Sequence, residues 1–177
     1  MPTYFIKATF IAFISLNLLI YPLLAKPPVI IEADKMELNN HSQTLKASGN
    51  LVITNGDIKL KGHHALYNQK HSTLHIQSTD YVLMTQGLLT ISSKDVMSNI
   101  LDQVFIASGN TTVFFPPYSG RSDNIVYNRT INTITLKGNP ILSQGEDELL
   151  AEEITIDLNR KKVYSKGYTK YKSIKEE

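Results

Sequence analysis

The most constraining feature of this sequence of 177 residues is an internal repeat of 29 to 30 residues. Five units can be laid on one another, and each ends on a closing residue at the same place in the unit. Four of the five closing residues are glycine, and three of these glycines are followed by asparagine: Gly49, Thr79, Gly109, Gly138 and Gly167. Because one short repeat cannot bury its apolar face alone, the units must stack on one another.

Each unit has the pattern of two β-strands around a polar turn. In the clearest unit, the apolar stretch 125–127 precedes polar residues 128–130 and the alternating stretch 133–136. β-branched and aromatic residues that alternate with polar ones favour strands with one apolar face and one solvent-exposed face. Helical periodicity is nearly absent after residue 25. The sequence predicts an all-β fold of about a dozen short antiparallel strands, as a solenoid-like roll, a jelly roll or a closed barrel.

One segment breaks this pattern near the middle of the chain. Residues 114–118 read Phe-Phe-Pro-Pro-Tyr. Proline has no N–H group to donate to a strand ladder. We therefore expect a bend or an edge crossing at this point.

The first 25 residues differ from the rest. A start with one positive charge, residues 1–7, precedes the apolar run 8–25, which ends in Ala25. These features are typical of a secretory signal peptide cut after Ala25, although Leu23 stands where a small residue is preferred. The alternative is an uncleaved membrane anchor, since about 18 apolar residues is near the spanning minimum. Cleavage leaves residues 26–177 as one domain.

The charges of the mature chain are nearly balanced. Removing Lys7 from the 18 basic residues leaves 17, against 16 acidic residues. This balance argues against a nucleic-acid binder, which needs a strongly basic face. The chain has no cysteine, so its stability must come from its core and backbone pairing. Basic residues gather from Arg160 onward, and the tyrosines at 164, 168 and 171 predict a last strand that continues to about residue 171.

Several motifs resemble those of the OstA-like lipopolysaccharide transport family. The N-terminal part contains Ile-Glu-Ala-Asp at 31–34, Gly-Asn-Leu-Val-Ile-Thr-Asn-Gly at 49–56 and Ile-Lys-Leu at 58–60. The second half repeats the theme at 122–128, 136–140 and 151–157. With an export signal and a domain of this length, the chain is most similar to the periplasmic bridge proteins of that family.

The resemblance implies a twisted, semi-open β-jelly-roll of repeated antiparallel hairpins with an apolar interior. It implies that acyl chains of lipopolysaccharide lie in that interior and pass from the inner to the outer membrane. It also implies edge-to-edge contact with an LptC-like inner-membrane protein and an LptD-like outer-membrane protein, and head-to-tail homo-oligomers by edge-strand addition. An LptC-like protein that keeps residues 8–25 as a membrane helix is one alternative. A structural β-solenoid that binds proteins is another.

Strand alternation gives the residues expected to line the apolar groove. The other interpretation of these residues is an ordinary sealed core, because most apolar strand faces are core. A β-bulge or a slip of one residue would turn some of them outward. The expected groove residues are Val29, Ile31, Leu51, Ile53, Ile58, Leu60, Leu74, Ile76, Val104, Ile106, Val113, Phe115, Ile125, Tyr127, Ile134, Leu136, Ile154 and Ile156.

Four histidines, at 63, 64, 71 and 75, raise the question of a metal site. Their spacing matches no zinc pattern. His71 and His75 on one strand would be about 13 Å apart at roughly 3.3 Å per residue. We expect no metal and no cofactor.

Acidic and basic clusters complete the candidates. The acids at 146–148 and 152–153 are candidates for paired catalytic carboxylates. Neighbouring residues of a strand, however, point to opposite faces. No nucleophile elbow, phosphate loop or dinucleotide motif occurs, so the sequence predicts a protein that is not an enzyme. The lysines at 46, 59, 61 and 70 could meet lipid phosphates at a rim. A solubilising outer face is their other interpretation.

Overall fold

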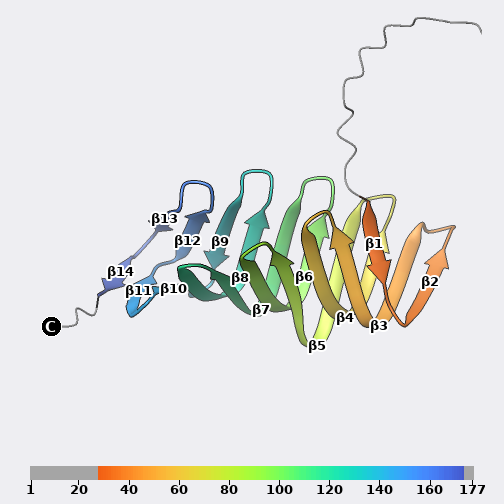
Figure 1. The fold of residues 1–177 in the computed structure, drawn as a ribbon, viewed down its shortest axis with the longest axis horizontal. Coiled ribbons are helices and arrows are strands. Elements are labelled where there is room, and N and C mark those ends of the chain that lie inside the picture. Colours follow the sequence, from red (N-terminus) through yellow and green to blue (C-terminus); the bar gives the residue numbers. More distant parts are fainter. Residues whose placement is uncertain (1–27, 174–177) are drawn as a thin grey trace, which may run out of the picture.

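The computed structural model describes residues 28–173, and this part of the chain is all-β (Figure 1). The expected signal segment 1–25 lies outside the described residues. Residues 28–173 contain no helix that could span a membrane. The fourteen strands are β1 (Val29–Glu32), β2 (Lys35–Asn39), β3 (Thr44–Asn55), β4 (Ile58–Asn68), β5 (Thr73–Gln86), β6 (Leu89–Asn99), β7 (Val104–Phe115), β8 (Tyr118–Asn128), β9 (Thr133–Lys137), β10 (Ile141–Gln144), β11 (Asp147–Leu150), β12 (Glu153–Asp157), β13 (Lys162–Lys166) and β14 (Lys170–Lys172).

All of these strands belong to one antiparallel sheet, in which each strand pairs mainly with its neighbours in sequence. The sheet begins with β1 and β2, which both pair with β3, and it ends with β13 on β12 and β14 on β11. Figure 1 shows an elongated roll with β1 and β2 at one end and β13 and β14 at the other. The predicted all-β fold of repeated antiparallel hairpins is confirmed.

A line of irregular pairing crosses the long strands β3 to β8. Register shifts follow Ser48 in β3, Lys61 in β4, Gln77 in β5, Ser92 in β6 and Ser108 in β7. The same line separates β1 from β2 and β9 from β10. Bulges bend a strand and increase its twist. Irregularities at the same level on the successive long strands β3 to β8, continued by the breaks between the short strands, therefore fold the sheet along one corner.

The corner divides the sheet into two walls that face each other. Wall A consists of β2, β9, β12, β13 and the strand segments 44–48, 64–68, 73–77, 95–99, 104–108 and 124–128. Wall B consists of β1, β10, β11, β14 and the segments 51–55, 58–61, 82–86, 89–92, 111–115 and 118–122. Side chains of both walls form one apolar cluster.

Glycine and asparagine make the corner. Gly49 has φ of +77° and Gly138 has φ of +74°, and Asn50 and Asn139 follow with φ of 43° and 52°. A Cβ placed on Gly49 would lie 2.5 Å from Oδ2 of Asp34, whose own N–H donates to the Gly49 carbonyl. The left-handed backbone and the close carboxylate both require glycine at this position. The repeated Gly-Asn pair of the sequence is thus the corner of the roll.

Two expectations about local structure are settled by the strand bounds. Pro116 and Pro117 form the turn between β7 and β8. The predicted interruption is therefore a hairpin turn, at the end of wall B that lies away from the corner. The expected continuous last strand is wrong: β13 ends at Lys166, and β14 begins only at Lys170. Gly167, with φ of +82°, breaks the strand because it is the corner of the last unit.

Candidate functional site

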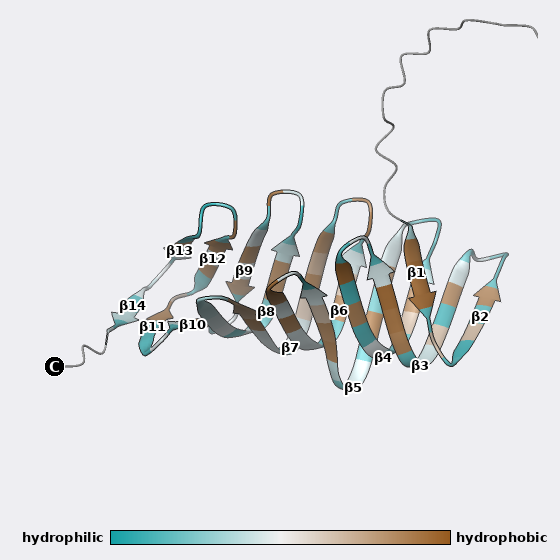
Figure 2. Cartoon of the chain, viewed as in Figure 1, coloured by the Kyte–Doolittle hydropathy of each residue, from teal (hydrophilic) through white to brown (hydrophobic). Residues whose placement is uncertain are grey.

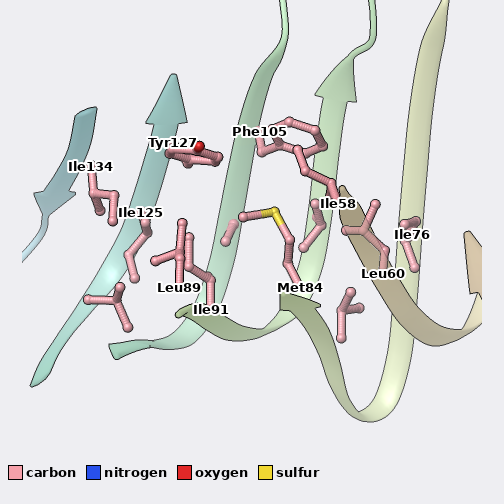
Figure 3. Packing of buried hydrophobic residues seen from close by; sticks show 14 of the residues in the cluster. Ile58, Leu60, Ile76, Met84, Leu89, Ile91, Phe105, Ile125, Tyr127 and Ile134 are labelled. Carbon is pink, nitrogen blue, oxygen red and sulfur yellow. The ribbon is translucent and has the colours of Figure 1, made fainter. Parts of the chain in front are cut away.

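The interior between the walls is one apolar cluster of side chains. Figure 2 shows hydrophobic residues along the strands of the whole roll, and Figure 3 shows some of the buried side chains. Cross-strand pairs such as Ile134 with Ile156 and Leu136 with Ile154 place their side chains on the same inner face. The rings of Phe105 and Tyr127 stack in it, with centroids 6.1 Å apart. Among the largest side chains that are at least 98% buried are Tyr127, Leu51, Ile53, Ile58, Leu60, Ile76, Met84, Ile91, Ile125, Ile134, Leu136 and Ile154.

Sixteen of the eighteen expected groove residues lie in this core or pack against it. Thirteen are buried: Leu51, Ile53, Ile58, Leu60, Leu74, Ile76, Val113, Ile125, Tyr127, Ile134, Leu136, Ile154 and Ile156. Val29, Ile31 and Phe115 are partly buried against the cluster. The structure thus brings these residues together on one inner face.

Val104 and Ile106 are the two exceptions, since the expectation that they face inward is wrong. Ile106 is 45% exposed, whereas Phe105 and Ala107 are buried. On β7 the inner residues are 105, 107, 111, 113 and 115. All have odd numbers, because the Gly-Asn pair at 109–110 contributes two residues and so leaves the alternation of inner and outer side chains unchanged. On β8 the inner positions change from even to odd numbers between Ser122 and Ile125.

Part of the core was not predicted from the sequence. Val82 and Met84 on β5 face Leu89 and Ile91 on β6 across the 87–88 turn, and all four are buried. Their alternation on both sides of a glycine turn was the available signal. The complete set missed is Ala47, Ala65, Val82, Met84, Leu89, Ile91, Val96, Phe105, Ala107, Leu142 and Leu158.

Inward-facing apolar side chains become exposed at both ends of the roll. Met36 on β2 pairs with Ala47 and therefore shares its inner face, yet Met36 is 47% exposed. Tyr171 on β14 pairs in the same way with Leu149 and is 62% exposed. No further strand of the described residues covers either side chain. The apolar inner face thus runs from one end of the roll to the other.

A hydrogen-bonded network closes the mouth, the line along which the hairpin loops of wall A meet those of wall B. The Tyr127 hydroxyl donates to Oε1 of Gln86 at 2.5 Å, and Nε2 of Gln86 donates to Oδ2 of Asp57 at 2.8 Å. Nη2 of Arg129 reaches Oδ1 of the same carboxylate at 2.5 Å. The same hydroxyl of Tyr127 also lies 3.3 Å from Oδ1 of Asn132. Tyr127 and Arg129 come from wall A, whereas Gln86 and Asp57 come from wall B.

Burial raises the pKa of Tyr127 above its ordinary value, and the charge of Asp57 acts in the same direction. Arg129 and the hydrogen bond to Gln86 oppose this shift. The phenol therefore remains neutral at physiological pH and acts as a hydrogen-bond donor.

The hollows near the interior are small. One at the mouth, of about 240 Å³, is lined by Phe115, Tyr127 and Leu158 among others. Another, of about 160 Å³, lies beside Leu149 and Tyr171 at the C-terminal end. Larger hollows of about 570 and 580 Å³ lie on the outer face of wall A. Ligand pockets usually measure about 300–1,000 Å³, so the two hollows near the interior are smaller than a usual ligand pocket.

The rings of two of the four candidate histidines have hydrogen-bond partners. Nδ1 of His63 lies 2.7 Å from Oγ of Ser78, and Nε2 of His75 lies 2.6 Å from Oδ2 of Asp95. Among the described residues, no group of three metal-ligating side chains comes together.

The acids and lysines lie on the surface. Glu153 pairs with Lys137 at 3.0 Å on the outer face of wall A. Lys59 and Lys61 are exposed on the outer face of wall B, and Lys46 is exposed on wall A. These lysines lie on different walls, so no single rim gathers them.

Comparison with known proteins identifies a family. The family described as LptA/(LptD N-terminal domain) LPS transport protein matches residues 30–162. No curated protein matches the sequence. Among solved structures, the chain is similar to LptH from Pseudomonas aeruginosa, the LptA homologous periplasmic component of a lipopolysaccharide transport device. The identity is 15%, the match covers 84% of this chain and 96% of that one, and the TM-score is 0.38. A match to a transport family confirms the prediction that the chain is not an enzyme.

Proposed function

The chain belongs to the LptA/LptD N-terminal domain family of lipopolysaccharide transport proteins, and we propose that it is a periplasmic carrier. It binds lipopolysaccharide acyl chains between its two walls and passes them from the inner to the outer membrane. The observation that carries this proposal is the apolar inner face, which continues from Met36 at one end to Tyr171 at the other.

The physical chemistry of such a face suits a conduit. Each buried methylene group contributes about 0.8 kcal/mol, so one acyl chain contributes several kcal/mol. The contacts are non-directional and similar along the roll. A lipid can therefore move along the interior without being trapped in a deep local minimum of free energy. The groove residues of this proposal are the sixteen inward-facing residues named above, with Met36 and Tyr171 at the ends.

The two ends of the roll carry opposite charges, which favours head-to-tail contact. The β1–β2 end carries Glu32, Asp34 and Glu37 against one lysine, Lys35. The β13–β14 end carries Lys162, Lys166, Lys170 and Lys172. Within the described residues, each terminal strand pairs on one side only. We propose that these edges add strands of LptC-like and LptD-like partners, or of a second copy.

Export follows from the same proposal. The segment 1–25 acts as a signal peptide that is cut after Ala25, which releases the carrier into the periplasm. An LptC-like anchored protein would keep this segment. The mass of the protein isolated from cells distinguishes the two: an intact N-terminus contradicts the cleaved carrier.

A structural β-solenoid that binds proteins is the second candidate, and the tight core favours it. Large side chains such as Ile58, Ile76 and Tyr127 fill the space between the walls. In a solenoid this core stays permanently dry and closed. In a carrier the walls must part.

In-cell photo-crosslinking separates the two. A photoreactive residue is placed at Ile58, Ile76 or Tyr127, and the matched control is Ile106, which faces outward from wall A. A carrier gives a lipopolysaccharide adduct at the inner positions and none at Ile106. Absence of an adduct at all three inner positions, with folded protein, overturns the carrier proposal.

A further inference from the structure

The mouth network joins the two walls through one ion pair and several neutral groups. The ion pair is between Arg129 on the β8–β9 loop and Asp57 on the β3–β4 turn, which are 72 residues apart in sequence. The side chain of Arg129 is only 20% exposed, whereas that of Asp57 is 57% exposed. The cation is thus set into the mouth, and its carboxylate partner faces water.

The neutral members of the network exchange partners at little cost. The Tyr127 hydroxyl lies within hydrogen-bond distance of the side-chain oxygens of Gln86 and Asn132 at the mouth, and water can replace such bonds when the walls separate. Arg129 is different, because a largely buried guanidinium that loses its carboxylate is left poorly solvated. The ion pair is therefore the element of the mouth that most strongly opposes opening.

We propose that the Arg129–Asp57 pair is a latch that an anionic headgroup opens. Resting on the proposed function, the inference is that a phosphate on the sugar headgroup of the lipid takes the place of Asp57 on Arg129. The mouth then opens between the walls, and the acyl chains enter the apolar interior.

The chemistry of the two partners supports this exchange. A guanidinium binds phosphate and carboxylate through the same pair of parallel N–H donors, so one anion can replace the other directly. Asp57 is accessible to a competitor from the solvent side, and its release leaves a well-solvated carboxylate. Asp57, the partner of Arg129, lines the hollow that Phe115, Tyr127 and Leu158 also line, so a headgroup that replaces Asp57 has its acyl chains next to the core.

The first test compares lipid A that carries its phosphates with enzymatically dephosphorylated lipid A. Arg129→Gln removes both the latch and the phosphate site. We expect it to weaken binding of phosphorylated lipid A about tenfold, as for the loss of one charge-assisted bond. The same variant binds dephosphorylated lipid A more tightly than the wild type does, because no ion pair needs breaking. An equal change for both lipids overturns the latch.

Asp57→Asn gives the complementary result. It removes the competitor for Arg129, so binding of phosphorylated lipid A strengthens about two- to fivefold. Lys137→Gln is the matched control, because it breaks the ion pair with Glu153 at 3.0 Å on the outer face. Lys137→Gln leaves the binding of both lipids unchanged. An equal gain in Asp57→Asn and Lys137→Gln contradicts the proposal.

A reversible lock tests the opening itself. The chain has no cysteine, so the pair Asp57→Cys and Arg129→Cys provides the only thiols for a short bis-methanethiosulfonate crosslinker. The locked protein loses at least tenfold in affinity for phosphorylated lipid A relative to the same protein after reduction. A crosslink between Lys137→Cys and Glu153→Cys, within wall A, has no effect.

The outcomes separate the latch from the function on which it rests. Equal binding by the locked and reduced forms overturns the latch and leaves the carrier intact. Failure of the wild-type protein to bind either form of lipid A overturns both proposals.

Discussion

The hydroxyl of Tyr127 donates a hydrogen bond to Oε1 of Gln86 across the mouth of the roll, 2.5 Å away. The ring of the same tyrosine is buried and stacks on Phe105, with centroids 6.1 Å apart. One side chain thus belongs to the apolar core and to the polar closure of the mouth. Any opening of the walls at this point must break the bond and expose the ring together.

Replacing Tyr127 by phenylalanine keeps the ring and removes the bond across the mouth. We expect the free energy of unfolding to fall by about 1 kcal/mol, the usual net value of one hydrogen bond. Urea unfolding followed by circular dichroism measures the loss. Tyr168→Phe is the control, because Tyr168 is 79% exposed. A loss no larger than that of the control would show that the bond contributes nothing to closure.

The raised pKa of Tyr127 makes the stability of the protein depend on alkaline pH. Burial is the largest cause of this shift. Above pH 10 the unfolded chain releases the phenolic proton while the folded chain keeps it, so the unfolded state binds fewer protons and stability falls as pH rises. Tyr127→Phe lacks this component. We expect the stability advantage of the wild type over the variant to shrink between pH 9 and pH 11, as measured by urea unfolding. An advantage that grows with pH contradicts the shift.

The corrected inner face of β7 is tested by two neighbouring substitutions. Phe105 is 3% exposed and Ile106 is 45% exposed. Phe105→Ala should destabilise the protein by about 3–5 kcal/mol, the usual cost of a cavity left by a buried ring. Ile106→Ala should cost less than about 1 kcal/mol. Denaturant midpoints compare the two, and the reverse order would restore the alternation first expected from the sequence.

The corner of the first repeat unit is tested at Gly49, with Gly87 as the control. Both glycines have positive φ, +77° and +55°, but a Cβ on Gly87 meets no atom within 4 Å. Gly87→Ala therefore carries only the backbone strain, about 1–2 kcal/mol. Gly49→Ala adds the collision with Asp34 and should cost more. Thermal unfolding measures both. Equal losses would mean that Asp34 moves aside freely.

Local sequence predicted the repeated strands well because each strand is specified by its own alternation. Ile134 and Leu136 alternate with polar threonines, so their inner face could be predicted and is confirmed by their complete burial. The Gly-Asn pairs correctly marked the place where one unit passes to the next. These features depend on residues that are close together in the chain.

The parts that could not be predicted depend on distant contacts or on ambiguous patterns. Residues 104–107 are all apolar, so both faces of this segment satisfied the alternation rule, and the corner geometry decided between them. The bond from Tyr127 to Gln86 joins residues 41 apart, and the pair of Arg129 with Asp57 joins residues 72 apart. No spacing rule reaches these contacts, because they arise only when the sheet folds at its corner.

The opposite charges at the two ends of the roll predict an association that depends on salt. Exposed charges are screened over about 8–10 Å at physiological ionic strength, so contact between the lysines of β14 and the acids near β2 should weaken as salt rises. Analytical ultracentrifugation between 50 mM and 500 mM salt measures this. Reversal of both Lys170 and Lys172 to glutamate should weaken self-association at low salt and remove its salt dependence. Arg121→Glu, exposed on the outer face of wall B in β8 and away from the terminal strands, is the control. An equal effect of this control would assign the association to net charge and not to the edge strands.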